Sequence, residues 1–203
     1  MLRTIRFVLA SALLSFVAAG WARADVITFE NFAPPGGLVN INPAFPYNEA
    51  GFRLTPTNGN SAVFDSAALV DMPGNTTDFF GFEESNIITL TNIAGASFNL
   101  NSVLLGPLSI AGGPSSMTLV GNFAAGGSIT RTFSALTTAT LVTFSDFNDL
   151  SSVVFRTTDD SGLDNINVTV GHVVPEPTTM LLLGIGLAGI AGRALKRRHA
   201  NKQ

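Results

Sequence analysis

Short apolar and β-branched runs, separated by Gly, Pro, Asn and Ser, make up the chain between residues 25 and 172. Residues 97–103 alternate apolar and polar side chains with the period of a strand that has one wet face. Comparable short runs lie at residues 26–29, 52–55, 62–64, 79–82, 87–90, 117–121, 128–133, 140–144, 152–156 and 165–170. No segment in this region sustains a helical apolar period. The pattern favours an all-β domain, an antiparallel β-sandwich with a jelly roll as the expected topology.

Turn-forming residues mark the connections between these runs. Residues 34–46 begin with two prolines and two glycines, so a long loop is expected there. Ala125-Gly126-Gly127 joins two strand-like runs in the pattern of a hairpin. No internal repeat stands out, and the domain is expected to span residues 25–172.

An apolar stretch near each end of the chain departs from this pattern. Residues 1–24 have the three parts of a signal peptide: arginines first, an apolar run over residues 7–20, and Ala22-Arg23-Ala24 before Asp25. Cleavage is therefore predicted after Ala24. A first transmembrane helix is the alternative, but the run is too short and ends in small residues.

The C-terminal stretch divides into three parts. The sequence predicts a rigid linker over residues 173–177, containing Pro175-Glu176-Pro177, a transmembrane helix over residues 178–195, and a basic cytoplasmic tail over residues 196–203. A buried helix of a soluble domain is the alternative interpretation. Small residues at Gly184, Ala188 and Gly192 recur every four positions and could admit a partner helix, although membrane helices are rich in glycine in any case.

Charge is divided sharply along the chain. Residues 25–172 contain three arginines, no lysine and thirteen Asp and Glu, which gives a formal charge of −10 against −3 for the whole chain. Such a domain repels nucleic-acid phosphates, so a nucleic-acid partner is excluded. Positive charge at both ends places the domain outside the inner membrane. Because the chain has no cysteine, packing, sheet hydrogen bonds or a metal ion must stabilise it.

The order of parts at the C-terminus resembles the PEP-CTERM sorting signal. Pro175-Glu176-Pro177 is followed at once by a short glycine-bearing span and a basic tail. The resemblance implies an exported protein of a Gram-negative, exopolysaccharide-producing bacterium, anchored through residues 178–195 in membrane lipid until exosortase, a membrane protease, removes the tail. The same tail is also known under an ice-binding label. The threonines at residues 137–140 are too few and too irregular for an ice-binding array.

The ends of the domain carry a second resemblance. Ile27-Thr28-Phe29-Glu30 and residues 162–168 are similar to the first and last strands of jelly-roll domains in PEP-CTERM proteins and in related carbohydrate-binding modules. In those modules the two strands are neighbours, and a structural calcium often lies between them. The resemblance implies Glu30 and Asp164 as calcium ligands. The alternative is that these acids are ordinary loop carboxylates.

Catalytic residues are scarce. The two histidines, His172 and His199, lie at the linker and in the tail, and residues 25–172 contain no cysteine or lysine. We therefore expect no enzyme activity. The sequence favours a non-enzymatic surface or extracellular-matrix protein associated with exopolysaccharide and biofilm. The alternative is a carbohydrate-binding module with a structural calcium, for which Tyr47 and Phe45 would supply the exposed aromatic surface.

Overall fold

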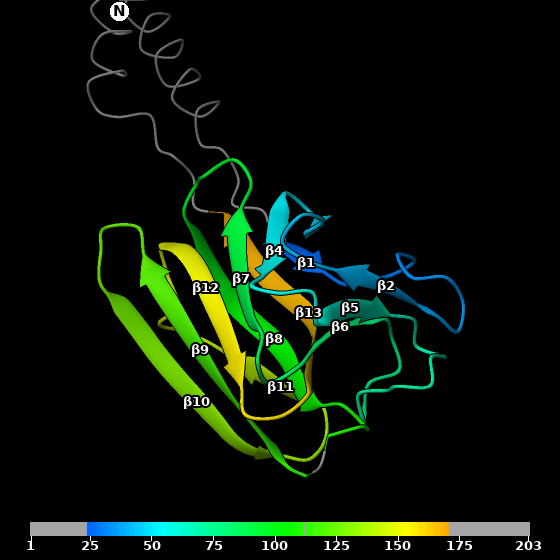
Figure 1. Ribbon diagram of the computed structural model, residues 1–203. Helices are drawn as coiled ribbons and strands as arrows, with labels where there is room; N and C mark the ends of the chain where they lie inside the picture. Colours follow the sequence, from blue (N-terminus) through cyan, green and yellow to red (C-terminus); the bar gives the residue numbers. More distant parts are fainter. Residues whose placement is uncertain (1–23, 112, 171–203) are drawn as a thin grey trace, which may run out of the picture. The chain divides into compact units, whose positions relative to one another are not determined.

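The computed structural model describes residues 24–111 and 113–170 (Figure 1). The predicted signal peptide, linker, transmembrane helix and basic tail, with the small-residue stripe, lie outside the described residues. Residues 22–171 form one compact unit, and the described part of it contains strands and no helix. Within that part, accordingly, no helix has the length and hydropathy to cross a membrane. The prediction of an all-β domain is confirmed.

Thirteen strands make up the described part of the domain, and every pairing between them is antiparallel. They are β1 (Ala24–Ile27), β2 (Leu38–Ile41), β3 (Tyr47–Glu49), β4 (Phe52–Pro56), β5 (Ser61–Phe64), β6 (Phe79–Phe82), β7 (Ile87–Asn92), β8 (Phe98–Pro107), β9 (Ser115–Phe123), β10 (Ser128–Leu136), β11 (Thr140–Thr143), β12 (Leu150–Thr157) and β13 (Ser161–Val170).

The strands fall into two layers joined by one pairing, Leu150 with Phe98. One layer has the order β10-β9-β12-β7-β4-β3. The other has the order β11-β8-β13-β6-β5-β2, with β1 also beside β13. Figure 1 shows β10, β9 and β12 side by side in the first layer. Through this one pairing, all thirteen strands form a single, nearly closed antiparallel sheet.

Alternation along the strands builds the core. In β4, in β7 and in β12 from Val153 onward, buried side chains alternate with less buried ones, and most buried apolar positions of both layers join one cluster. Phenylalanine dominates its largest members, with Phe52 and Phe98 meeting edge to face at 5.1 Å. Because this core lies within residues 24–170, the unit has what it needs to fold by itself.

The long-loop prediction for residues 34–46 is wrong in part. Leu38–Ile41 forms β2, which pairs with β5, and Asn42 and Phe45 make an isolated bridge. The prolines and glycines that precede β2 do form a turn, with the Gly37 N–H donating to the Pro34 carbonyl. The strand at the end of the domain also begins four residues earlier than expected, at Ser161.

Candidate functional site

The first and last strands of the domain are neighbours, as the resemblance at its two ends implies. Ala24 to Ile27 of β1 pair with Thr169 to Ile166 of β13. Further along, Ser161 to Leu163 of β13 pair with β6 instead. Asp164 therefore lies where β13 changes partner from β6 to β1, between two stretches of regular pairing.

Asp164 is fully buried. Its Oδ2 accepts hydrogen bonds from Thr77 Oγ1 at 2.6 Å, Asn75 Nδ2 at 3.0 Å and Asn165 Nδ2 at 3.1 Å. Its Oδ1 accepts the Asn165 backbone N–H at 2.6 Å. The pKa of Asp164 is raised to about 6: burial and, less strongly, the charge of Glu30 raise it, while the hydrogen bonds to the carboxylate oppose the rise.

Glu30, the other predicted ligand, lies in the turn after β1 rather than on the strand, and it is exposed. Two other acids, which the sequence analysis does not predict as site residues, accept hydrogen bonds from the backbone of this turn. The Glu49 carboxylate accepts the N–H groups of Thr28 and Phe29, each at 3.0 Å. Asp78, which is 4% exposed, accepts the Asn31 N–H at 3.0 Å.

We name Glu30, Glu49, Asp78 and Asp164 the acidic junction. Its turn is strained, because Phe29 has a φ of 62° although it is neither glycine nor asparagine. The Phe29 ring is fully buried and packs 4.9 Å from the ring of Tyr47. That packing and the Glu49 carboxylate stabilise the turn.

Tyr47 contacts this junction and does not belong to an exposed aromatic surface. It is 3% exposed, and its hydroxyl donates to Glu49 at 2.7 Å. Burial, the Glu49 hydrogen bond and the charges of Glu49, Asp78 and Asp164 all raise the pKa of Tyr47. The prediction that Tyr47 could contact a sugar is wrong, whereas Phe45 is 72% exposed.

The arrangement does not form a ready ligand shell for a metal ion. Calcium takes six to eight oxygens, but Asp164 Oδ2 already accepts three hydrogen bonds. Within residues 24–111 and 113–170, no group of three or more His, Cys, Asp or Glu could hold a metal ion. Calcium binding by Glu30 and Asp164 stays a prediction.

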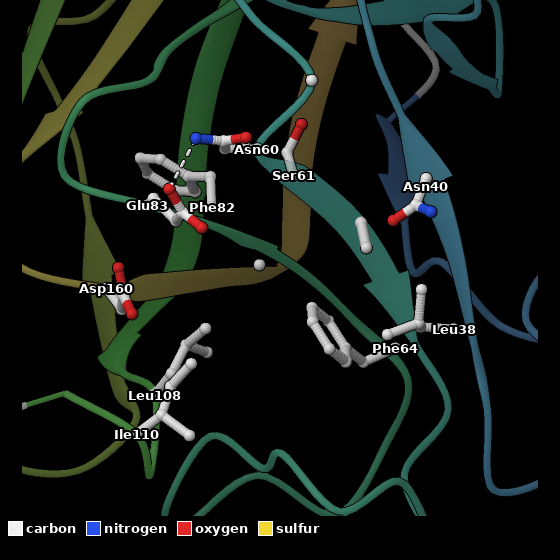
Figure 2. A pocket seen from close by; sticks show the side chains of 13 residues that line it. Leu38, Asn40, Asn60, Ser61, Phe64, Phe82, Glu83, Leu108, Ile110 and Asp160 are labelled. Carbon is white, nitrogen blue, oxygen red and sulfur yellow. Dashed lines mark hydrogen bonds between the residues drawn. The ribbon is translucent and has the colours of Figure 1, made fainter.

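A second candidate site is a groove beside β2, β5 and β6, with a cavity volume of about 270 Å³ (Figure 2). Its apolar lining includes Phe64, Leu38 and Ile110, of which Leu38 is 45% and Ile110 59% exposed. Phe64 stacks on Phe79 at 5.2 Å with an interplanar angle of 11°. Gly81 makes room for the Phe64 ring, because a Cβ there would lie 2.7 Å from Phe64 Cε2.

Polar groups line the rest of the groove. Asn60 Nδ2 donates to Glu83 Oε2 at 2.6 Å, and Asn40 and Asp160 face the same space in Figure 2. Burial raises the pKa of Asp160, and the negative charges of Glu83, Asp159 and Glu84 raise it further. The lining contains no lysine or arginine. The groove therefore combines an apolar floor with amide and carboxylate groups.

Sequence comparison identifies the C-terminal segment. Residues 173–198 match the family model of the PEP-CTERM protein-sorting motif, which confirms the resemblance at Pro175-Glu176-Pro177. Such a motif indicates an exported protein that is membrane-anchored and then sorted to the surface through exosortase. No curated protein matches the chain.

Structure comparison finds carbohydrate-binding modules among the similar solved structures. The N-terminal CBM22-1-CBM22-2 tandem domain of Paenibacillus barcinonensis Xyn10C has 11% identity and a TM-score of 0.40, and the match covers 78% of this chain and 49% of that one. TmCBM61, solved in complex with β-1,4-galactotriose, has 7% identity and a TM-score of 0.33, with 60% of this chain and 90% of that one covered. The chain thus spans about half of the first structure. Neither likeness says what this chain binds.

Proposed function

We propose that the chain is a non-enzymatic surface or extracellular-matrix protein, released from a membrane anchor by exosortase, that binds a polysaccharide of the exported matrix. The sorting motif at residues 173–198 supports the location. The absence of lysine and cysteine from residues 25–172, where the one histidine is His172, supports a role without catalysis. A domain of formal charge −10 is also suited to remain soluble outside the cell.

We infer further that the domain is a jelly roll. Its last eight strands divide as β6-β13-β8-β11 in one layer and β7-β12-β9-β10 in the other. Successive strands therefore cross between layers, except at the β9–β10 hairpin, and the first and last of the eight are neighbours. Two antiparallel layers of four strands connected in this way are what the jelly-roll topology requires.

The groove is the observation that carries the binding proposal. Ligand sites combine an apolar surface with a few polar groups that fix orientation. A sugar ring offers both partners, because its C–H faces can pack on Phe64 and Ile110 while its hydroxyls bond to Asn60 and Glu83. The volume of about 270 Å³ suits one or two sugar rings rather than a long chain.

Two exposed isoleucines give a matched test of the groove. Ile110 lines it and is 59% exposed, while Ile93 lies outside it and is 51% exposed. The purified domain should bind members of a neutral glycan array. Ile110→Ser should weaken that binding about tenfold, because burial of part of the side chain contributes ~1–2 kcal/mol. Ile93→Ser should bind like the wild type.

Asn60→Ala tests the polar part of the same site, since it removes the amide that donates to Glu83. It should also weaken binding without changing the melting temperature by more than a few degrees. Equal affinities for wild type, Ile110→Ser and Asn60→Ala would show that the groove is not the binding site. The array is read with and without calcium. Binding that requires calcium would support the alternative, a carbohydrate-binding module with a structural calcium.

A further inference from the structure

The acids of the domain lie mostly in its loops, and only Asp25, Glu49 and Asp164 lie in strands. Five adjacent strands, in the order β10-β9-β12-β7-β4, contain none of the thirteen Asp and Glu of residues 25–172. The same five strands contain all three arginines of that region, Arg53, Arg131 and Arg156. The next strand of this layer, β3, pairs with β4 and carries one acid, Glu49.

The outward face of these strands consists of hydroxyl, amide and β-branched side chains together with two arginines, Arg156 on β12 and Arg53 on β4. One row across it, read from the pairing register, runs Thr130, Val120, Val154, Thr89, Thr55. Hydrogen bonds link neighbours on this face, at 3.0 Å between the hydroxyls of Thr118 and Thr132 and at 2.9 Å from Asn122 to Ser152. We name the arginine face by its members: Arg53, Thr55, Ile87, Thr89, Thr91, Thr118, Val120, Asn122, Ser128, Thr130, Thr132, Ser152, Val154 and Arg156.

Arg53 and Arg156 are exposed on this face, and both neighbours of each along its strand are buried. Within the described residues neither forms an ion pair; Arg53 Nε donates to the neutral Asn48 Oδ1 at 3.0 Å. Arg156 pairs in register with Ile87 of β7, and Arg53 with Thr91 of the same strand. The Cα atoms of Arg53 and Arg156 are therefore roughly 13 Å apart along the strands and about 10 Å apart across them.

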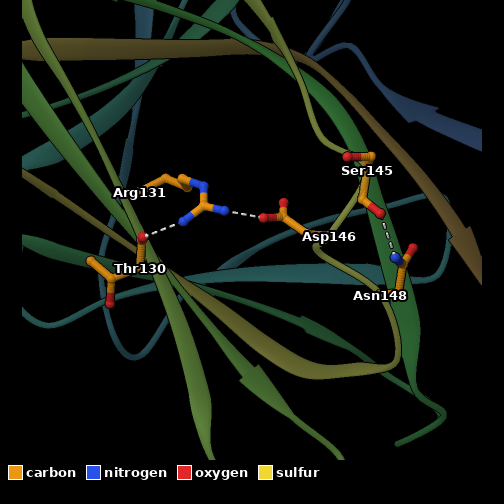
Figure 3. Close-up of polar contacts among 5 residues, drawn as sticks. All are labelled: Thr130, Arg131, Ser145, Asp146 and Asn148. Atoms are coloured by element: carbon orange, nitrogen blue, oxygen red, sulfur yellow. Dashed lines mark hydrogen bonds and ion pairs between the residues drawn. The ribbon is translucent and has the colours of Figure 1, made fainter.

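Arg131 differs from the other two arginines. It lies between Thr130 and Thr132 on β10 and therefore points to the opposite side of the strand from the arginine face. There its guanidinium forms an ion pair with Asp146 (Figure 3). The described part of the chain thus contains two unpaired arginines on the face and one paired arginine off it.

We propose that the arginine face binds an acidic polysaccharide, a chain of sugars that carries carboxylate groups. A guanidinium binds a carboxylate through two parallel hydrogen bonds, and the hydroxyl and amide side chains on the same face can bond to sugar hydroxyls. Elsewhere the acidic domain repels a polyanion, so the charge pattern directs such a chain to this face.

A protein partner fits this face less well. Stable protein interfaces have an apolar or aromatic centre, and none of the large exposed hydrophobic side chains of the described residues belongs to the arginine face. A hydrated glycan needs no such centre. The proposal rests on the exported location and is independent of the groove, whose carboxylates would repel the same chain.

The test titrates the purified domain of residues 22–171 with polygalacturonate, and with neutral dextran as the control polymer, by isothermal calorimetry at low salt. Arg53→Gln, Arg156→Gln and Arg131→Gln each remove one positive charge, so net charge is matched among the three variants. We expect Arg53→Gln and Arg156→Gln each to weaken polygalacturonate binding at least threefold, and their combination at least tenfold. Arg131→Gln and Ile110→Ser should bind it like the wild type.

Several results would overturn the proposal. One is the absence of polygalacturonate binding by the wild type, and another is equal weakening by all three arginine variants, which would mean a general charge effect. Loss of binding in Ile110→Ser would place the acidic chain in the groove. Self-association in sedimentation velocity that requires Arg53 and Arg156, without polygalacturonate binding, would make the partner a second copy of the chain.

Discussion

Replacing Asp164 by Asn should change how the stability of the domain depends on pH. The wild-type carboxyl is fully buried, and its pKa is raised from the usual 3.8 to about 6. A raised pKa means that the folded state holds the proton more tightly than the unfolded state does. The stability that this group contributes is then present below the unfolded pKa of 3.8 and is lost as the pH rises through about 6.

The magnitude follows from the size of the shift. A rise from 3.8 to about 6 corresponds to about 3 kcal/mol of unfolding free energy between the two ends of the titration. Other carboxyl groups titrate over the same range, so the wild-type curve alone does not isolate Asp164. The difference between wild type and Asp164→Asn does isolate it, because the amide does not titrate. We expect that difference to change by about 2–3 kcal/mol between pH 4 and pH 8.

The assay is urea unfolding of residues 22–171, followed by circular dichroism at half-unit steps of pH. Asp65 supplies the control, because it is partly exposed and hydrogen bonds from the backbone N–H groups of Gly36 and Ala67 lower its pKa. For Asp65→Asn the difference from wild type should run the opposite way, because a lowered pKa contributes stability above the unfolded value that is lost as the pH falls. A difference between wild type and Asp164→Asn that stays constant from pH 4 to pH 8 would refute the reasoning.

Thermal melts of the same domain test the calcium prediction. A bound cation favours the charged carboxylate, so millimolar calcium should raise the melting temperature of the wild type at neutral pH by mass action. Asp164→Ala should stay folded and show no such rise. Glu30→Gln should reduce it, since Glu30 lies close enough to affect the pKa of Asp164. Wild-type melts that overlap in chelator and in calcium would show that the prediction is wrong.

Four further predictions each depend on a single feature of the chain. Tyr47, the only tyrosine, should not ionise near pH 10 while the domain is folded; tyrosinate absorbance should appear only with the loss of circular dichroism. Gly106→Ala should destabilise the domain by about 1–3 kcal/mol in urea unfolding, because a Cβ there would lie 2.9 Å from Ala139 Cα. N-terminal sequencing of exported protein should begin at Asp25, and the segment with residues 173–198 should be lost only in a host that has exosortase.

The strands are largely predictable because alternation is a local property. Residues 98–100 and 153–156 lie within β8 and β12, where burial of every second side chain requires that pattern. The sequence does not predict β2, because the strand has only four residues after a proline-glycine turn, too few to show a clear alternation of apolar and polar side chains. This segment forms a strand because β5 supplies its hydrogen-bond partners, and that information is not local.

The candidate sites are predictable only at the ends of the domain. The neighbouring positions of β1 and β13 are expected from the motifs around Glu30 and Asp164, and the pairing confirms them. Glu49 and Asp78 cannot be found in this way, because they lie 20 and 47 residues from the N–H groups that they bind. The groove depends on the packing of Phe64 over Gly81, which no local pattern encodes.

Strand preference alone offers a simpler account of the arginine face. Asp and Glu are depleted in strands generally, so their absence from five strands need not reflect a ligand. That account, however, does not explain why Arg53 and Arg156 form no ion pair within the described residues of a domain with thirteen acids. It also predicts that replacing any one of the three arginines has the same effect on polygalacturonate binding, because each would contribute only one unit of net charge. The proposal predicts that Arg131, paired with Asp146, differs from the other two, so the matched glutamine variants decide between the explanations.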